Sequence, residues 1–119
     1  MNSYQELIVW QKSIDLVAEI YKLTESFPNN EMYGLTSQMR RAAVSIPANI
    51  AEGFCRKHKQ EYAQFVRIAF GSGGELETHL VIAKRLGFVD VEKYEKIEPL
   101  LLEVMKMLNK LIQSLTTSR

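Results

Sequence analysis

Hydrophobic residues recur every three or four positions through most of the chain, which is the spacing of α-helices that bury one face. Three prolines and six glycines are too few for an all-β protein built on tight turns. Short breaks divide the pattern into four segments, so the sequence predicts four helices. We expect them over about 4–25, from Leu35 to near Gly53, over about 59–86, and from the N-cap Asp90 through Leu115.

The predicted helices carry residues that typically begin or end a helix. Ser3 and Glu6 have the spacing of a capping box before the first helix, and Asp90 is suited to cap the fourth. Gly87, followed by an apolar residue, marks the end of the third helix. Pro28 and the two asparagines after it predict a reversal of the chain after the first helix.

Two prolines lie inside the predicted helices. Pro47 removes one backbone hydrogen bond, but the hydrophobic stripe continues in phase beyond it, so we expect a kink rather than an end. Pro99 is expected to bend the fourth helix or to separate a short first piece. Four long amphipathic helices with short connections predict an all-α fold, an antiparallel up-and-down four-helix bundle. The 119 residues suit a single domain, spanning 1–119.

The first and fourth helices have more apolar positions than one buried stripe needs. A wide stripe facing the core explains the surplus, and so does a subunit interface on a second face. In the first helix one set is Leu7, Trp10, Ile14, Val17 and Tyr21, and the additional set is Val9, Leu16, Ile20 and Leu23. In the fourth helix the heptad is Tyr94, Ile97, Leu101, Val104, Leu108, Leu111 and Leu115, and the additional set is Leu100, Leu102, Met105, Met107 and Ile112.

A polar seam is predicted between the second and third helices. Glycines inside a helix cost roughly 1 kcal/mol each against alanine, which favours a close helix approach as compensation. We expect Ser45 and Asn49 to bond across to Ser72, and Glu75 to pair with Arg41. A break in the third helix and a ligand site are the alternatives. The seam residues are Arg41, Ser45, Asn49 and Glu52 on the second helix, and Gly71, Ser72, Gly74 and Glu75 on the third.

Catalytic and metal-binding motifs are weak in this sequence. The glycines around Gly73 continue a helix and lack the preceding strand of a phosphate-binding loop. Glu75 and His79 are at most half of a metal site, and Cys55 with His58 lacks a residue to orient the base. We therefore expect no catalytic residues, no metal, no cofactor and no enzymatic activity.

Charge is almost balanced overall, at a net +1, but residues 40–67 hold six basic and two acidic side chains. The candidate nucleic-acid-binding residues are Arg40, Arg56, Lys57, Lys59 and Arg67. A solvated helix junction would have the same composition.

The cellular setting follows from what the sequence contains. Cys55 is the single cysteine, so no disulfide within the chain is expected. The N-terminal segment has no basic-then-apolar signal pattern, and no apolar run approaches the roughly 18 residues of a membrane span. We expect a cytoplasmic protein without a membrane partner.

Several segments together carry a family resemblance, above all Asn49-Ile50-Ala51-Glu52-Gly53 and Gly71-Ser72-x-x-Glu75, with Tyr4-x-x-Leu7-x-Val9-Trp10-Gln11-Lys12 and Gln38-x-Arg40-Arg41-Ala42. They resemble the bacterial four helix bundle protein family, which includes proteins encoded in intervening sequences of 23S ribosomal RNA genes. The family is similar to the accessory variability proteins of diversity-generating retroelements.

This resemblance implies an antiparallel four-helix bundle that assembles into a ring-like homopentamer without enzymatic activity. In the retroelement relatives, a basic surface contacts nucleic acid and a reverse transcriptase. The resemblance therefore suggests as partners other copies of the chain, and RNA or a reverse-transcriptase-like protein. The leading hypothesis is an oligomeric bundle that binds RNA or a protein partner. The alternative is a structural or protein-interaction bundle without affinity for nucleic acid.

Overall fold

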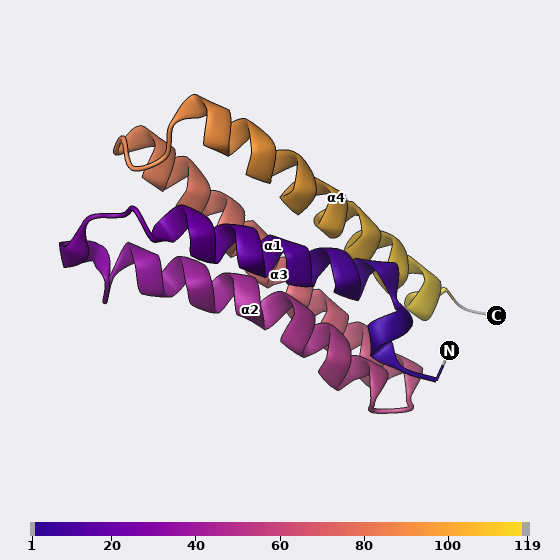
Figure 1. Cartoon of the computed structure of the whole chain (residues 1–119). Helices are drawn as coiled ribbons and strands as arrows, with labels where there is room; N and C mark the ends of the chain where they lie inside the picture. Colours follow the sequence, from indigo (N-terminus) through magenta and orange to yellow (C-terminus); the bar gives the residue numbers. More distant parts are fainter. Residues whose placement is uncertain (1, 118–119) are drawn as a thin grey trace.

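Four antiparallel α-helices form an elongated bundle with principal extents of 49 × 23 × 20 Å (Figure 1). The computed structural model describes residues 2–117, so Met1 and residues 118–119 of the expected 1–119 domain lie outside it. The helices are α1 (Ile8–Thr24), α2 (Leu35–Phe54), α3 (Lys59–Arg85) and α4 (Val91–Thr116), and residues 2–117 contain no strand. The prediction of an all-α four-helix bundle is confirmed.

The order of the helices around the bundle follows their order in the chain. Each helix packs against its neighbour in sequence, and α4 returns to pack against α1. The diagonal pairs have no Cα atoms within 8 Å of each other in the described residues, and α2 with α3 forms the most extensive pair. This is the up-and-down topology, and it leaves each helix with one face toward the core and one toward solvent.

The core is a continuous layer of aliphatic side chains contributed by all four helices. Leu16, Met39, Leu76 and Leu101 are fully buried, one from each helix. On α4 the predicted heptad supplies the buried positions Ile97, Leu101, Val104 and Leu108. On α2 the buried apolar stripe contains Met39, Ala42, Ala43, Ile46 and Ile50.

On α1 the core is formed by the additional apolar set and not by the more regular set that runs from Leu7 to Tyr21. The additional set is the core: Leu16 and Ile20 are fully buried. The set that steps from Leu7 to Tyr21 faces sideways and outward, with Ile14 40% exposed and Tyr21 41% exposed. The surplus on α1 is therefore a second apolar face, lying about a third of a turn around the helix from the buried one.

The predicted first helix starts too early. Tyr4–Glu6 form a separate 3₁₀ turn (η1), Leu7 is extended, and α1 begins only at Ile8. Ser3 caps the 3₁₀ turn by accepting from the backbone N–H of Gln5 at 3.1 Å, rather than capping α1. The break places Tyr4 edge-on against Trp10, at 5.4 Å between ring centroids, and against Phe54 of α2 at 6.5 Å.

Both internal prolines are accommodated inside continuous helices. Pro47 is buried within α2, and α4 runs through Pro99 without being split. The stripe that continues in phase past Pro47 correctly predicted that α2 does not end there.

The predicted caps between α3 and α4 are present. Gly87 has a φ of +81°, and the N–H of Phe88 donates to the carbonyl of Ala83 at 2.9 Å, the main bond of a Schellman motif. Asp90 Oδ1 accepts from the N–H of Lys93 at 2.8 Å and caps α4. The buried Phe27 packs against Phe88, with ring centroids 5.6 Å apart, and covers this end of the bundle.

Candidate functional site

The polar seam between α2 and α3 is centred on a hydrogen bond between two serines. The Oγ atoms of Ser45 and Ser72 are 2.8 Å apart, as the sequence predicted. Asn49 bonds within its own helix instead of across to Ser72. Its Nδ2 donates to the Ser45 carbonyl at 2.8 Å and to Ser45 Oγ at 2.9 Å.

The charged members of the predicted seam do not pair across the helices. Arg41 and Glu75 form no ion pair within 4 Å of each other in the described residues, so that prediction is wrong. Instead, Nε2 of His79 on the same helix lies 3.8 Å from Glu75 Oε2. Glu52 pairs with Arg56 at 3.0 Å, one helical turn away. The partner of each of these glutamates lies four residues further along the chain, so neither glutamate is held by the opposite helix.

The glycines that bring the helices together differ from those predicted. A Cβ atom added at Gly71 or Gly74 would meet nothing within 4 Å, so neither forms a close contact with α2. At Gly53 an added Cβ would lie 2.8 Å from Phe65 Cβ and 3.1 Å from the carbonyl oxygen of Tyr62. The close approach of α2 and α3 is therefore at Gly53, which was not among the predicted seam residues. Gly73 faces α4, where a Cβ would lie 2.9 Å from Met105 Cγ.

Beside the serine pair, α2 and α3 enclose an open polar cavity of about 430 Å³, which we call the α2–α3 hollow. Every side chain that lines it comes from the two segments 38–45 and 72–75, which also carry parts of the family resemblance. The lining residues are Gln38, Arg41, Ala42, Ser45, Ser72 and Glu75.

The five candidate nucleic-acid-binding residues do not form one surface. Arg40 donates from Nε to Thr24 Oγ1 at 2.8 Å and lies 4.5 Å from the centroid of the Tyr21 ring. It lies 14 residues before Phe54, where α2 ends, which is about 21 Å at 1.5 Å per residue, and Arg56 lies beyond that end. Arg40 therefore belongs to the α1–α2 contact, and the prediction that it joins the other four is wrong.

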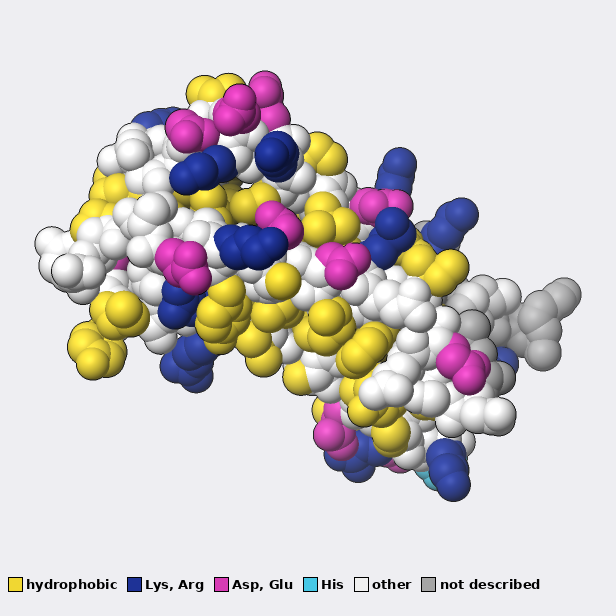
Figure 2. All heavy atoms as spheres, viewed as in Figure 1, with side chains coloured by type: hydrophobic (Ala, Val, Ile, Leu, Met, Phe, Trp, Pro, Cys, Tyr) yellow, Lys and Arg dark blue, Asp and Glu magenta, His cyan; other side chains and the backbone are white. Residues whose placement is uncertain are grey.

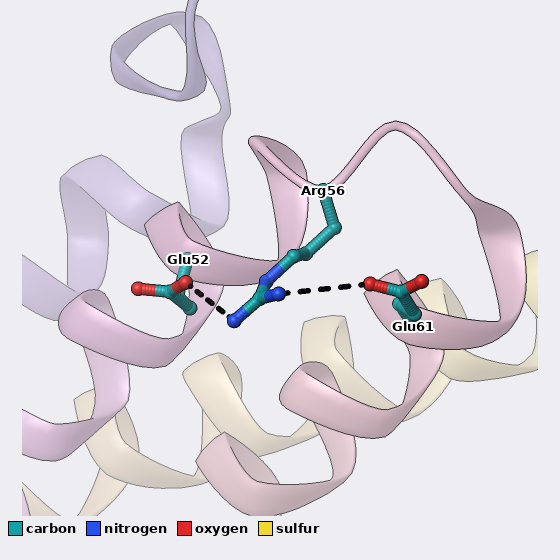
Figure 3. Close-up of polar contacts among 3 residues, drawn as sticks. All are labelled: Glu52, Arg56 and Glu61. Atoms are coloured by element: carbon teal, nitrogen blue, oxygen red, sulfur yellow. Dashed lines mark ion pairs between the residues drawn. The ribbon is translucent and has the colours of Figure 1, made fainter.

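Arg56, Lys57 and Lys59 lie at the turn from α2 to α3, whereas Arg67 lies two turns further along α3 and lines a cavity with Leu115 and Thr116 of α4. We call these four residues the end surface. Arg56 is bracketed by two carboxylates, with nitrogen–oxygen distances of 3.0 Å to Glu52 and 3.8 Å to Glu61 (Figure 3). Lys57 occupies the turn with a φ of +68°, and Lys59 begins α3. In the described residues Lys57, Lys59 and Arg67 form no ion pair within 4 Å, so they carry the cationic charge of this surface.

Two tyrosines have shifted acidities. Partial burial raises the pKa of Tyr62, which packs edge-on against Phe54 at 6.0 Å near Gly53. The hydrogen bond that Tyr94 donates to Glu98 at 2.9 Å raises the pKa of Tyr94, and burial and the charges of Glu98 and Glu77 add to the effect. Both shifts favour the neutral hydroxyl over the phenolate.

A third surface is formed by the second apolar stripe of α1 and the adjoining face of α2. Val44 and Ala48 follow Arg40 at intervals of one turn, so they share its side of α2. Figure 2 shows a band of hydrophobic side chains over α1 and its boundary with α2, with charged side chains mainly toward α4 and the ends. We call this the α1–α2 outer face: Trp10, Ile14, Val17 and Tyr21 of α1 with Arg40, Val44 and Ala48 of α2.

Groups of three or more potential metal ligands do not occur in residues 2–117. Cys55 is exposed at the end of α2. His79 is 8% exposed, and its Nδ1 is the buried side-chain atom without a hydrogen-bond partner in the described part of the chain. Among the helices between residues 2 and 117, none combines the length and apolarity needed to cross a membrane.

The sequence model of a protein family, the 23S rRNA-intervening sequence protein, matches residues 5–110. The chain belongs to this family. It is also similar to a crystal structure from Bacteroides thetaiotaomicron, described as a protein of unknown function from the S23 ribosomal protein family. That similarity has a TM-score of 0.82 and 26% sequence identity, over 89% of this chain and 96% of the other. No curated protein matches the sequence.

Membership of the 23S rRNA-intervening sequence protein family agrees with the resemblance carried by the motifs. The matched region contains the α2–α3 hollow, the end surface and the α1–α2 outer face. The relative of known structure has no assigned function. The features of this 23S rRNA-intervening sequence protein that bear on its function are therefore these three surfaces.

Proposed function

We propose that the protein is a non-catalytic bundle that assembles with copies of itself through the α1–α2 outer face. The observation that carries this proposal is the second apolar stripe of α1. Ile14, Tyr21 and Val44 are each 40–42% exposed, on a face where Arg40 is the charged member. The guanidinium of Arg40 is bonded to Thr24 and stacked over Tyr21, so it is already partnered within the chain.

Contiguous exposed apolar surface on a protein domain typically marks an interface. A second copy is the occupant that we favour, because the family resemblance implies assembly into a homopentamer. Burying this face would remove apolar area from water while leaving the core unchanged.

The test is the mass of the protein in solution, measured by light scattering after size-exclusion chromatography. Wild type should give several times 13.7 kDa at micromolar concentration. Ile14→Asp should give the monomer with unchanged helical circular dichroism. Ile82→Asp is the matched control, because Ile82 on α3 is 42% exposed but lies outside the proposed interface. A monomeric wild type, or loss of assembly in both variants, contradicts the proposal.

A second candidate function is RNA binding by the end surface. The specific observation is that, within residues 2–117, Lys57, Lys59 and Arg67 form no ion pair with a carboxylate, whereas Arg56 pairs with two. A closed assembly would repeat these cations around its axis and strengthen a field that is weak in one copy. Binding would follow the phosphate backbone and tolerate many sequences, because no residues here form a base-reading motif.

This candidate is tested by measuring the affinity for a structured RNA at several salt concentrations. Affinity should fall steeply with salt, as release of counterions requires. A variant with Lys57, Lys59 and Arg67 changed to Glu should bind weakly and remain assembled. The control has the same change of charge on α4, with Lys93, Lys96 and Lys110 changed to Glu. Equal binding by the two variants, or no binding by wild type at low salt, favours the protein-interaction bundle without nucleic-acid affinity.

A further inference from the structure

The α2–α3 hollow has the size of a small-molecule site and a mostly polar lining. Its volume of about 430 Å³ lies within the range of roughly 300–1,000 Å³ that such sites occupy. It lies between α2 and α3, and Arg41 also borders a smaller cavity beside Tyr21 and Arg40 of the α1–α2 outer face. Five of its six lining side chains are polar, and they come from both helices. Polar groups that converge on one cavity from two rigid helices can fix the orientation of a ligand.

The serine pair leaves one hydroxyl hydrogen available in the hollow. The Ser45 carbonyl can only accept, so its contact with Asn49 fixes the amide with Nδ2 toward Ser45. Ser45 Oγ therefore accepts from Asn49. Two hydroxyl hydrogens remain, and the Ser45–Ser72 bond uses one of them. The other has no acceptor in the described residues, and both serines line the hollow.

The hollow also holds two opposite charges that do not neutralise each other. The Arg41 side chain forms no hydrogen bond or ion pair in the described part of the chain, and the Glu75 carboxylate lies 3.8 Å from the imidazole Nε2 of His79. Arg41, the free hydroxyl hydrogen and the Gln38 amide offer donors to an anionic group. The carboxylate of Glu75 accepts from a cationic or hydroxyl donor and repels a bare anion.

We infer that the α2–α3 hollow binds a small zwitterion. Its carboxylate or phosphate group lies against Arg41 and the serine hydroxyl, and its ammonium group lies against Glu75. A ligand with one charge of each sign satisfies both walls of the hollow, whereas a ligand with a single charge leaves the opposite wall unpaired and faces repulsion there.

The test uses four small molecules that differ in which charges they carry and in whether the anionic group is a carboxylate or a phosphate. Glycine carries a carboxylate with an ammonium group, and phosphoethanolamine carries a phosphate with an ammonium group. Inorganic phosphate and ethanolamine each carry one of these charges alone. Titration of the full-length ¹⁵N-labelled protein should give saturable shifts of residues around Ser45 and Ser72 with at least one zwitterion. Either single-charge probe should bind at least about tenfold more weakly, the loss expected for one charged hydrogen bond.

Three variants in the hollow and one control variant test the assigned roles. Arg41→Gln and Glu75→Gln remove one charge each at similar shape, and each should weaken zwitterion binding at least about tenfold. Lys110→Gln removes a charge from the outside of α4 and should bind as wild type does. Ser72→Ala gives an independent arm if a charge variant does not fold. The inference is overturned if neither zwitterion saturates, if ethanolamine or phosphate binds as well, or if Arg41→Gln and Lys110→Gln behave alike.

Discussion

The two apolar stripes of α1 have the same spacing and opposite surroundings. The inner stripe contains Leu16 and Ile20, both fully buried, while the outer stripe contains Ile14 and Tyr21, both about 40% exposed. In sequence the outer stripe is the more continuous of the two, because Ser13 and Thr24 interrupt the inner one. A helical period therefore predicts that a helix has an apolar face, and the neighbouring helices decide which face is buried.

The polar residues of the inner stripe are buried at low cost because backbone carbonyls of the same helix accept hydrogen bonds from their hydroxyl groups. Ser13 Oγ donates to the carbonyl of Trp10 at 2.7 Å, and Thr24 Oγ1 donates to the carbonyl of Ile20 at 2.8 Å. A serine or threonine bonded in this way can sit in a core face as a small side chain. Because two of its positions are polar, the core stripe cannot be recognised from hydrophobicity alone.

The largest expected effect is the difference in the free energy of unfolding between an alanine substitution in the inner stripe and one in the outer stripe. Leu16→Ala removes a fully buried side chain and should lower the free energy of unfolding by about 2–5 kcal/mol. Ile14→Ala on the outer stripe should change the stability of the monomer by only about 0.5 kcal/mol. Chemical denaturation at several protein concentrations measures both. The effect of Ile14→Ala should grow with concentration if the outer stripe is an interface, because assembly stabilises the folded state by mass action. A small effect of Leu16→Ala would contradict the assignment of the inner stripe.

The next effect compares glycines that face inward and outward. Gly53→Ala places a Cβ 2.8 Å from Phe65 Cβ and near the Tyr62 backbone, so the two helices must move apart. We expect a loss of about 1–3 kcal/mol in the free energy of unfolding. Gly71→Ala meets nothing within 4 Å and should gain up to about 1 kcal/mol from helix propensity. Thermal and chemical denaturation of both variants provide the measurement, and equal effects would contradict the placement of the close contact at Gly53.

The sequence was sufficient for features that depend on local chemistry. The Asp90 cap, the turn at Gly87 and the four helices follow from residue types and spacing within a few turns. The facing of Ser45 and Ser72 was also predicted, because antiparallel neighbours bring one polar position of each helix to the contact.

Features that depend on distant parts of the chain were missed. Leu7 is extended because Tyr4 packs on Trp10 and on Phe54, at the far end of α2. The role of Gly53 depends on where α3 returns beside it. Arg40 was assigned to a basic surface from charge alone, whereas its partners are on α1.

The serine pair provides a smaller effect within the α2–α3 contact. Ser45→Ala and Ser72→Ala should each lower the free energy of unfolding by about 1 kcal/mol, since each removes a hydrogen bond and leaves a partner unpaired. A double-mutant cycle measures their coupling, because removing both partners together should cost less than the sum of the single changes. Strictly additive effects would show that the bond contributes nothing to stability.

The smallest effect is expected on the opposite flank of α1, where Lys12 pairs with Glu103 of α4 at 3.3 Å. Both side chains remain exposed, at 35% and 49%, so water and salt screen their attraction. The coupling in a cycle of Lys12→Gln and Glu103→Gln should be about 0.2–1 kcal/mol at low salt and should fall toward zero at about 1 M salt, where the Debye length is near 3 Å. The stabilisation from the inner stripe should not fall as salt rises, because burial of apolar groups does not weaken when charges are screened. A coupling at this pair that survives high salt would show that α1 is held to α4 by charge as well as by its buried stripe.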